Sequence, residues 1–211
     1  MSIPEQFIQN LAEQCEPIPA SPSPLRLSGQ WLIEAIIYIG VSLLYLGVRP
    51  DIKLQLQSPS FYVEFFLLST LIIMASFSAA ALSYPDLYQR RKLIYLPFFT
   101  MALLVTFLLI QWQMTTHVTH APSHTWQCLL SITLLAVLPA GRVFYAIRKM
   151  ASTHYRLAGI TAMLFSLAIG SFVIGFSELN GAIAHAIQWH YLPIICISFA
   201  GLWLGKKYLT W

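Results

Sequence analysis

The chain has 211 residues, of which 57% are hydrophobic and only 9% are charged. A water-soluble domain carries about 25% charged residues, so this composition excludes a soluble globular protein and indicates a membrane protein. The formal net charge of +4 does not indicate a nucleic-acid-binding domain, because the basic residues stand between apolar segments. We therefore expect no direct contact with nucleic acid.

Residues 3–15 have the pattern of a short amphipathic helix. Apolar residues recur at helical spacing, and Glu and polar amides occupy the other side. The residues of this apolar face are Ile3, Phe7, Ile8 and Leu11. Such a short helix is not stable alone, and its lack of Lys and Arg argues against adsorption on anionic lipid. We interpret it as a protein-docking helix, with a frayed terminus as the alternative.

Prolines and long apolar segments divide the rest of the chain. The prolines that follow the helix predict an extended tether, and they are Pro17, Pro19, Pro22 and Pro24. Six apolar segments then approach the ~20 residues that a bilayer crossing requires. Their expected ranges are 30–48, 61–83, 93–112, 125–146, 157–177 and 187–205. The sequence predicts an all-α membrane protein with an N-terminal segment over 1–28 and a six-helix transmembrane bundle over 29–211.

The basic residues fall unequally on the two sides of these six crossings. With the N-terminus inside, only Arg49 and Lys53 lie outside. The ten basic residues inside are Arg26, Arg90, Arg91, Lys92, Arg142, Arg148, Lys149, Arg156, Lys206 and Lys207. This positive-inside asymmetry predicts a multi-pass protein in a lipid bilayer with both termini in the cytoplasm.

Two carboxylates lie inside apolar segments, where ionisable groups are costly and tend to face the bundle interior or a partner. Glu34 is near the cytoplasmic end of the first span, at a depth similar to that of Arg142 in the fourth. We predict that these two residues form an ion pair. Glu64 is at the outer end of the second span, at a depth where it can meet outer histidines. Because Glu34 and Glu64 occupy opposite leaflets, they cannot form one acid/base pair.

Small residues at four-residue intervals predict close packing of the last two spans. Such residues let a neighbouring helix approach closely in a membrane. They are Ala158, Ala162, Ser166 and Gly170 in the fifth span, and Gly201 and Gly205 in the sixth.

Potential metal ligands collect at the outer margin. The histidines there are His117, His120, His124, His185 and His190, and the other candidates are Asp51, Glu64, Cys128 and Glu178. Imidazole, carboxylate and thiolate together suit Zn(II) or a similar ion. However, the five-residue spacing of His185 and His190 places them on different faces of an α-helix. The alternative is that each histidine is an interfacial residue hydrogen-bonded to backbone or water.

The sequence lacks a Gly-rich phosphate loop, an HExxH pair, a CxxC motif and a nucleophile elbow. Cys15, Cys128 and Cys196 fall in different compartments of the expected topology, so no disulfide framework is indicated. We therefore expect no catalytic residues, no resident cofactor and no enzymatic activity.

Several short motifs resemble those of the NrsF family, the negative regulators of sigma F, which are membrane-bound anti-sigma factors. The resemblance covers nearly the whole chain and is most specific in its last 27 residues. The motifs are Arg49-Pro50-Asp51 after the first span, Cys128 after Trp126-Gln127, Leu138-Pro139 before Arg148-Lys149, Trp189-His190-x-Leu192-Pro193 after His185, and Lys206-Lys207-x-Leu209-x-Trp211 after Gly201-x3-Gly205.

The resemblance implies that the N-terminal segment holds an extracytoplasmic-function sigma factor at the bacterial inner membrane. The sigma-binding residues would then be those of the apolar face, Ile3, Phe7, Ile8 and Leu11. An outer stress such as a heavy metal or an oxidant would release the sigma factor. Without the resemblance, the residues are also compatible with a second function, that of a small metal-handling membrane transporter or carrier.

The resemblance also bears on the outer ligands. Two family cysteines are associated with the stress response; Cys128 matches the first, but Glu178 stands at the position of the second. This difference argues against a switch made of two thiols. It leaves the hypothesis of a site for a sensed ion such as Zn(II) or Cd(II), formed by Cys128, Glu178, His185 and His190.

Overall fold

The structure is a computed structural model that describes residues 3–14, 22–85, 91–114, 125–150, 152–178 and 183–210. Within these ranges the protein is helical and contains no β-strand, which confirms the predicted all-α fold. The elements are α1 (Ile3–Gln14), α2 (Pro24–Leu46), α3 (Ile52–Gln55), α4 (Pro59–Leu82), α5 (Arg91–Met114), α6 (Thr125–Arg148), α7 (Tyr155–Ser177), α8 (Ile183–His185), the π-helix η2 (Ala186–Tyr191) and α9 (Leu192–Tyr208).

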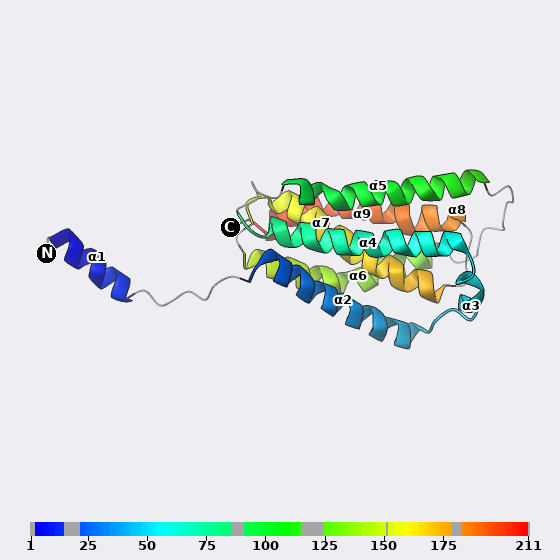
Figure 1. The fold of residues 1–211 in the computed structure, drawn as a ribbon, viewed down its shortest axis with the longest axis horizontal. Helices are drawn as coiled ribbons and strands as arrows, with labels where there is room; N and C mark the ends of the chain where they lie inside the picture. Colours follow the sequence, from blue (N-terminus) through cyan, green and yellow to red (C-terminus); the bar gives the residue numbers. More distant parts are fainter. Residues whose placement is uncertain are drawn as a thin grey trace.

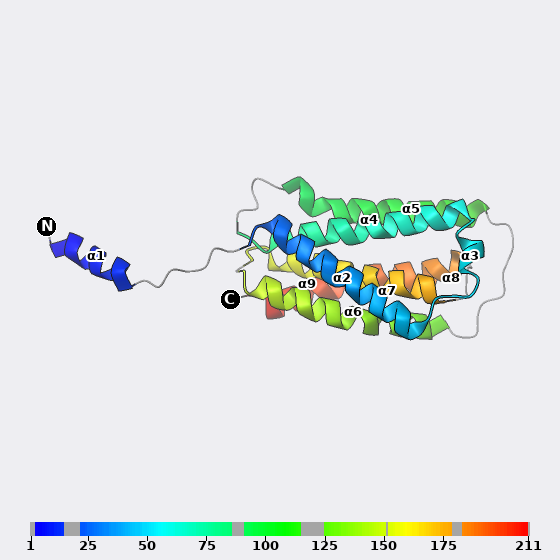
Figure 2. The same ribbon diagram turned by 60° about the horizontal axis from the view of Figure 1, so that its bottom comes forward.

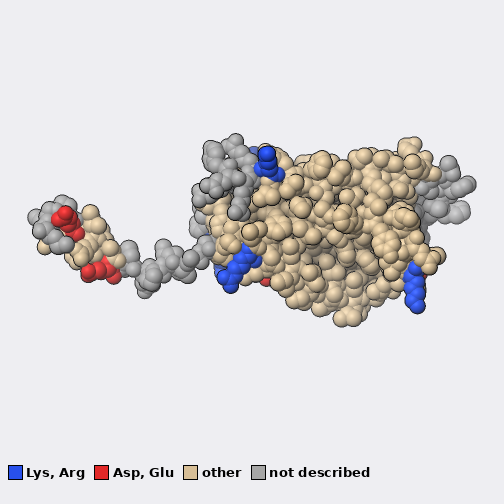
Figure 3. Space-filling view, in the orientation of Figure 1, with Lys and Arg blue, Asp and Glu red and all other residues tan. Residues whose placement is uncertain are grey.

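Six helices in these ranges are long and apolar enough to cross a bilayer. They are α2, α4, α5, α6, α7 and the composite helix α8–η2–α9, and each coincides with one of the six predicted spans. The face drawn in Figure 3 fits this interpretation, because Lys and Arg lie at the two ends of the bundle and the surface between them is almost entirely uncharged. The fold is therefore compatible with a multi-pass membrane protein.

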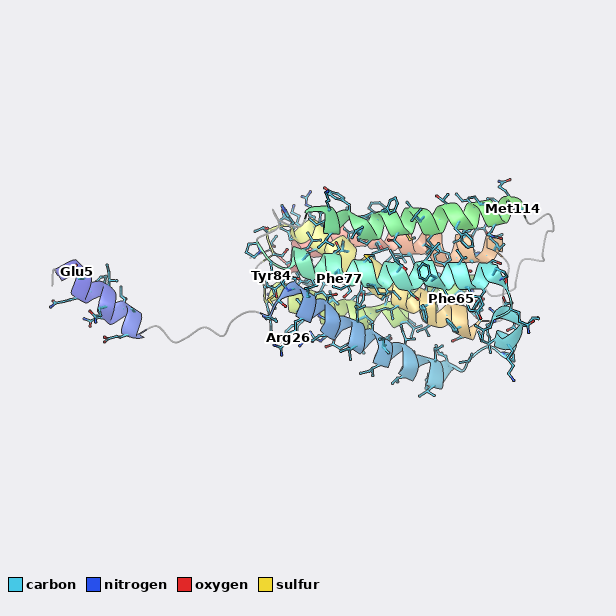
Figure 4. All side chains as sticks on the ribbon, in the orientation of Figure 1. Glu5, Arg26, Phe65, Phe77, Tyr84 and Met114 are labelled. Carbon is cyan, nitrogen blue, oxygen red and sulfur yellow. The ribbon has the colours of Figure 1, made fainter. Side chains whose placement is uncertain are left out.

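The six helices form one bundle with two distinct ends (Figure 1). We call proximal the end that contains Pro24, Leu82, Arg91, Arg148, Tyr155 and Tyr208, and distal the end that contains Leu46, Pro59, Met114, Thr125, Ser177 and Ile183. In Figure 4, Arg26 and Tyr84 mark the proximal end, and Phe65 and Met114 lie toward the distal end. The short helix α3 also lies at the distal end.

Helix α7 is the centre of the bundle. Most of its residues are buried, and it packs against α9, α6, α4 and α2, while α5 packs on α4. The small residues predicted to face a neighbour, Ala158, Ala162, Ser166 and Gly170, are all buried. Small side chains allow this single helix to contact four others closely.

The closest helix contact joins α7 to α9 through three glycines. A Cβ added to Gly201 would lie 2.4 Å from the carbonyl oxygen of Gly159, and one added to Gly205 would lie 2.2 Å from that of Tyr155. No side chain fits at these separations. Gly201 and Gly205 were predicted to face a neighbouring helix, and their partner on α7 is Gly159.

Helix α2 lies obliquely on the outside of the bundle (Figure 2). Its N-cap is Ser23, whose side chain accepts a hydrogen bond from the Arg26 amide, and Pro24 occupies the first turn. The prediction that Pro24 belongs to the extended tether is therefore wrong. Proline is well suited to the first turn of a helix, where its missing N–H leaves no hydrogen bond unmade.

Two polar contacts join α2 to α6. Arg142 Nη2 donates to Glu34 Oε1 at 2.8 Å, so the structure brings the two predicted ion-pair partners together. Tyr38 Oη donates to the carbonyl oxygen of Leu135 at 2.9 Å. Helix α6 continues through Pro139 without a break.

Helix α1 is drawn apart from the bundle in Figure 1, and it presents an apolar face that no other described residue covers. The exposed fractions of its side chains are 64% for Phe7, 64% for Ile8 and 49% for Leu11. Ile3 begins the same helix. The amphipathic helix predicted over residues 3–15 is thus present, ending at Gln14.

Candidate functional site

Four potential metal ligands meet at the distal end of the bundle. Cys128 lies in the first turn of α6, Glu178 directly follows α7, His185 ends α8, and His190 lies in η2. One ligand atom from each residue lies within 4.8 Å of the others. The structure therefore brings together the four residues of the hypothesis; we call this group the distal cluster.

The π-helix explains how both histidines reach the same side. Successive residues of an α-helix turn by about 100°, so residues five apart differ by about 140°. In η2 the Leu192 amide donates to the carbonyl oxygen of Ile187, five residues earlier, and this wider turn brings residues five apart nearly into line. The two imidazole centroids are 5.2 Å apart. The expectation that His185 and His190 occupy different faces is wrong because it assumed α-helical geometry.

Glu178 is the residue that joins the distal cluster. Cys128 Sγ donates to Glu178 Oε1 at 3.0 Å, and His190 Nε2 forms a hydrogen bond with Glu178 Oε2 at 3.1 Å. His185 Nε2 lies 3.2 Å from Glu178 Oε1. One carboxylate thus contacts a thiol and two imidazoles.

His185 is the member whose polar atoms are least satisfied. Only 4% of the residue is exposed, and neither ring nitrogen has a hydrogen-bond partner among the described residues. Its contact with Glu178 is close in distance but lacks hydrogen-bond geometry. Because leaving a buried polar atom unpaired costs about 1–3 kcal/mol, a ligand for His185 would stabilise the protein.

Opposing effects act on the pKa of Glu178. Partial burial raises the pKa, but the hydrogen bonds from His190 and Cys128 and the charges of both histidines lower it by more. The pKa of this carboxyl group therefore lies below its ordinary value. At neutral pH Glu178 is a carboxylate, the form that binds a cation.

The donor set fits a metal ion. A tetrahedral Zn(II) ion binds sulfur at about 2.3 Å and nitrogen or oxygen at about 2.0–2.2 Å, which separates its ligands by roughly 3.3–3.8 Å. The donor atoms of the distal cluster lie within 4.8 Å of one another, so side-chain movements of about 1 Å would bring them to that separation. One thiol, two imidazoles and one carboxylate also suit Zn(II) and softer divalent ions better than Mg²⁺ or Ca²⁺.

The other outer candidates have different surroundings. Tyr191 Oη donates to Glu64 Oε1 at 2.7 Å, so Glu64 contacts the residue next to His190 and is not part of the distal cluster. Asp51 accepts hydrogen bonds from Arg49 Nε at 2.6 Å and Arg49 Nη2 at 2.8 Å. His117, His120 and His124 lie outside the described residues.

Sequence reasoning missed the roles of Arg49 and Tyr191. Arg49 is 5% exposed, and its amide donates to the carbonyl oxygen of Phe176 at 2.9 Å, two residues before Glu178. The Arg49-Pro50-Asp51 motif was noted, but not this contact with α7. The hydrogen bond from Arg49 also lowers the pKa of Asp51 to about 2.

The fold and the distal cluster define a class of protein: a helical bundle suited to a membrane, with a candidate ion-binding site at one end and a separate amphipathic helix. Residues 11–211 match the NrsF family, described as negative regulator of sigma F. The chain therefore belongs to the NrsF family, which confirms the resemblance. The matched range includes Leu11 but not Phe7 or Ile8. Neither a curated protein nor a solved structure matches the chain.

Proposed function

We propose that this protein is a membrane-bound anti-sigma factor of the bacterial inner membrane, regulatory rather than catalytic. In this proposal α1 sequesters an extracytoplasmic-function sigma factor in the cytoplasm. A metal or oxidative signal at the distal end, on the outer side of the membrane, releases it. The observation that carries the proposal is the uncovered apolar face of α1 in a member of a family of sigma regulators.

The shape and chemistry of α1 support a protein partner. Phe7, Ile8 and Leu11 are largely exposed in the structure, and their burial in a groove of a partner would be favourable. The charged residues within α1 are Glu5 and Glu13, so a partner surface with positive charge around an apolar groove would complement it. Anti-sigma binding of this kind would mask a surface that the sigma factor needs for polymerase.

The distal cluster supports the sensing half of the proposal. A bound ion shifts a conformational equilibrium only if it binds one arrangement better than the other. Glu178 directly follows α7, and Arg49, which contacts the end of α7, is the third residue after α2. This short connection supports α2 as the element that transmits the signal from the cluster toward α1.

A titration tests the proposed ion. Zn(II) or Cd(II) is titrated into the purified full-length protein and into a Cys128→Ser/His190→Ala variant. Loss of two of four ligands should weaken binding by far more than tenfold. Equal affinities of the two proteins would remove the proposed site.

A capture experiment tests the proposed output. Tagged full-length protein in detergent is incubated with the cognate sigma factor, or with lysate of the source cell analysed for sigma factors. We expect retention by the wild type and loss of retention by Phe7→Ala/Leu11→Ala. The matched control, Gln6→Ala/Gln9→Ala, changes two exposed polar residues of the same helix and should retain the sigma factor. The anti-sigma proposal fails if no sigma factor is captured by the wild type.

A small metal-handling transporter or carrier is the alternative that the same distal cluster permits. Deletion of residues 1–20 separates the two functions. The deletion should abolish repression of sigma-dependent transcription if the protein is an anti-sigma factor. Metal flux that persists after the deletion would support the transporter.

A further inference from the structure

A cavity of about 160 Å³ lies at the distal end of the bundle, beside the distal cluster. Its polar lining comes from four elements: Gln55 of α3, Ser60 and Glu64 of α4, Gln111 of α5 and His190 of η2. Its apolar lining includes Phe65, which Figure 4 labels toward the distal end. The volume has room for several waters, and polar side chains line it from several directions, so we expect the cavity to be hydrated.

The charges around this cavity favour a cation. Arg49 lines it, but both carboxylate oxygens of Asp51 accept hydrogen bonds from the Arg49 side chain and balance its charge. Glu64 also lines it, and its partner there is the neutral hydroxyl of Tyr191. Glu64 is therefore the acidic side chain of the lining, hydrogen-bonded to Tyr191 whereas Arg49 is hydrogen-bonded to Asp51. A divalent cation that enters the cavity favours the ionised form of Glu64.

His190 connects the cavity to the distal cluster. Its ring belongs to the cavity lining, and its Nε2 contacts Glu178 in the cluster. Three of the four cluster residues, Cys128, His185 and His190, are no more than 8% exposed. Glu178 is partly exposed, with 24% of its side chain accessible, but an ion from the aqueous side needs a path to the three buried residues, and this cavity reaches His190 directly.

We propose that this cavity is the access route by which a divalent cation reaches the distal cluster, with Glu64 as the carboxylate that attracts the cation along the route. The inference rests on the proposed metal binding and assigns its entry path. A carboxylate along an entry path raises the association rate of a cation, and charged clefts change such rates by about tenfold or more. Glu64 thus acts on the rate of entry and is not a ligand of the bound ion.

The test measures the kinetics and the affinity of Co(II) binding by the full-length protein in detergent. The probe is the absorption of a thiolate–Co(II) bond in a chain whose Cys15 and Cys196 are replaced by serine, so that the absorption reports an ion at Cys128. We expect Glu64→Gln, which keeps an acceptor for Tyr191, to lower the association rate about tenfold with less than a threefold change in affinity. Glu13→Gln makes the same chemical change in α1 and should change neither quantity.

A second pair of variants tests the route by filling the cavity and leaves its charge unchanged. Ser60→Trp places a large ring in the cavity and should slow association by at least tenfold, whereas Ser60→Thr should leave the rate within twofold of the wild type. If Glu64→Gln does not give monodisperse protein, the two Ser60 variants alone decide whether the cavity is the access route.

Each outcome has one meaning. Wild-type association rates in both Glu64→Gln and Ser60→Trp overturn the access route but leave the metal site standing. An affinity that falls as much as the association rate in Glu64→Gln makes Glu64 part of the bound-ion site and overturns its role in entry. No thiolate–Co(II) absorption in the wild type overturns the metal site and the route together.

Discussion

At the scale of single residues, Glu178 organises the distal cluster. Its two carboxylate oxygens contact Cys128, His185 and His190, which come from three other elements. We expect Glu178→Ala to leave these buried groups without their common partner and to destabilise the ion-free protein by about 1–3 kcal/mol. The same change should weaken Zn(II) binding by more than tenfold.

Thermal unfolding in detergent and a Zn(II) titration check this prediction. Glu13→Ala is the matched control, because Glu13 is an exposed residue of α1, and it should change neither quantity. Unaltered stability and affinity in Glu178→Ala would show that the cluster does not depend on this carboxylate.

The Arg49–Asp51 pair gives a pH-dependent prediction. Asp51 has a folded-state pKa of about 2, below the ~3.9 of an unperturbed aspartate. Its contribution to stability is therefore fully present above about pH 4 and is lost as the pH falls toward 2. We expect Asp51→Asn to lower the melting temperature at pH 7, because buried Arg49 loses its counter-charge, and the difference from wild type to shrink below pH 4. A difference that is constant from pH 7 to pH 3 would contradict this origin.

The ligands of the distal cluster were predictable from the sequence as a set, but their geometry was not. Residue chemistry and the family resemblance together selected Cys128, Glu178, His185 and His190. The spacing of the histidines argued against a shared site, because one sequence pattern does not reveal a π-turn. The contacts of Glu64 with Tyr191 and of Arg49 with α7 depend on helix rotation and loop path, which hydropathy does not determine.

At the scale of elements, the π-helix is followed at once by the first turn of α9, which contains Pro193. Proline lacks the N–H that would bond to the carbonyl of Trp189 in an α-helix, and its ring crowds that carbonyl. The wider turn of η2 precedes this proline and aligns His185 with His190. The histidine geometry therefore depends on the combination of a five-residue spacing and a π-turn.

This relation predicts an unusual result for a deletion. Removal of Gln188, an exposed residue of η2, leaves the histidines four residues apart, which aligns them on an ordinary α-helix. We expect Zn(II) affinity within about threefold of wild type, since α5 and α6 show that this bundle accepts a proline inside a helix. Insertion of one alanine after Gln188 should weaken binding by more than tenfold, because six residues align in neither helix type. Loss of binding in both variants would contradict the proposed role of the π-turn.

The glycine contact between α7 and α9 predicts a stability effect. A methyl group at Gly201 meets backbone atoms of Gly159 at 2.4 Å, so Gly201→Ala should destabilise the bundle by about 1–3 kcal/mol through forced helix separation. Gly141→Ala is the matched control, because a Cβ at Gly141 has no neighbour within 4 Å. Denaturant unfolding in mixed micelles measures the stability of both variants. Equal stabilities of the two variants would show that α9 moves away from α7 without a cost in free energy.

Hydropathy predicted all six long helices because a bilayer requires long apolar segments, and small-residue spacing predicted that α7 and α9 each allow a neighbouring helix to approach closely. The sequence pattern did not predict that α2 starts at Pro24, because a proline at this position is compatible both with an extended tether and with the first turn of a helix. Nor did it identify Gly159 as the partner of Gly201 and Gly205. Such pairings depend on three-dimensional contacts between segments far apart in the chain.

At the scale of the whole molecule, the proposed function needs α1 and the distal cluster on opposite sides of the membrane. The bundle separates them by its full length (Figure 1). The chain itself supplies the expected orientation, because Arg49 and Lys53 fall on the distal side and the nine other basic residues within the described ranges fall on the proximal side. An excess of Lys and Arg favours the cytoplasmic side.

Cysteine labelling in intact spheroplasts tests this orientation. The variants are Lys53→Cys in α3 and Lys207→Cys in α9, both at exposed positions, in a chain whose native cysteines are replaced by serine. We expect a membrane-impermeant maleimide to label Lys53→Cys in intact spheroplasts and Lys207→Cys only after permeabilisation. The reverse pattern would place the distal cluster in the cytoplasm and α1 outside, where α1 could not meet a sigma factor. The labelling result therefore decides whether the distal cluster can report on an ion outside the cell.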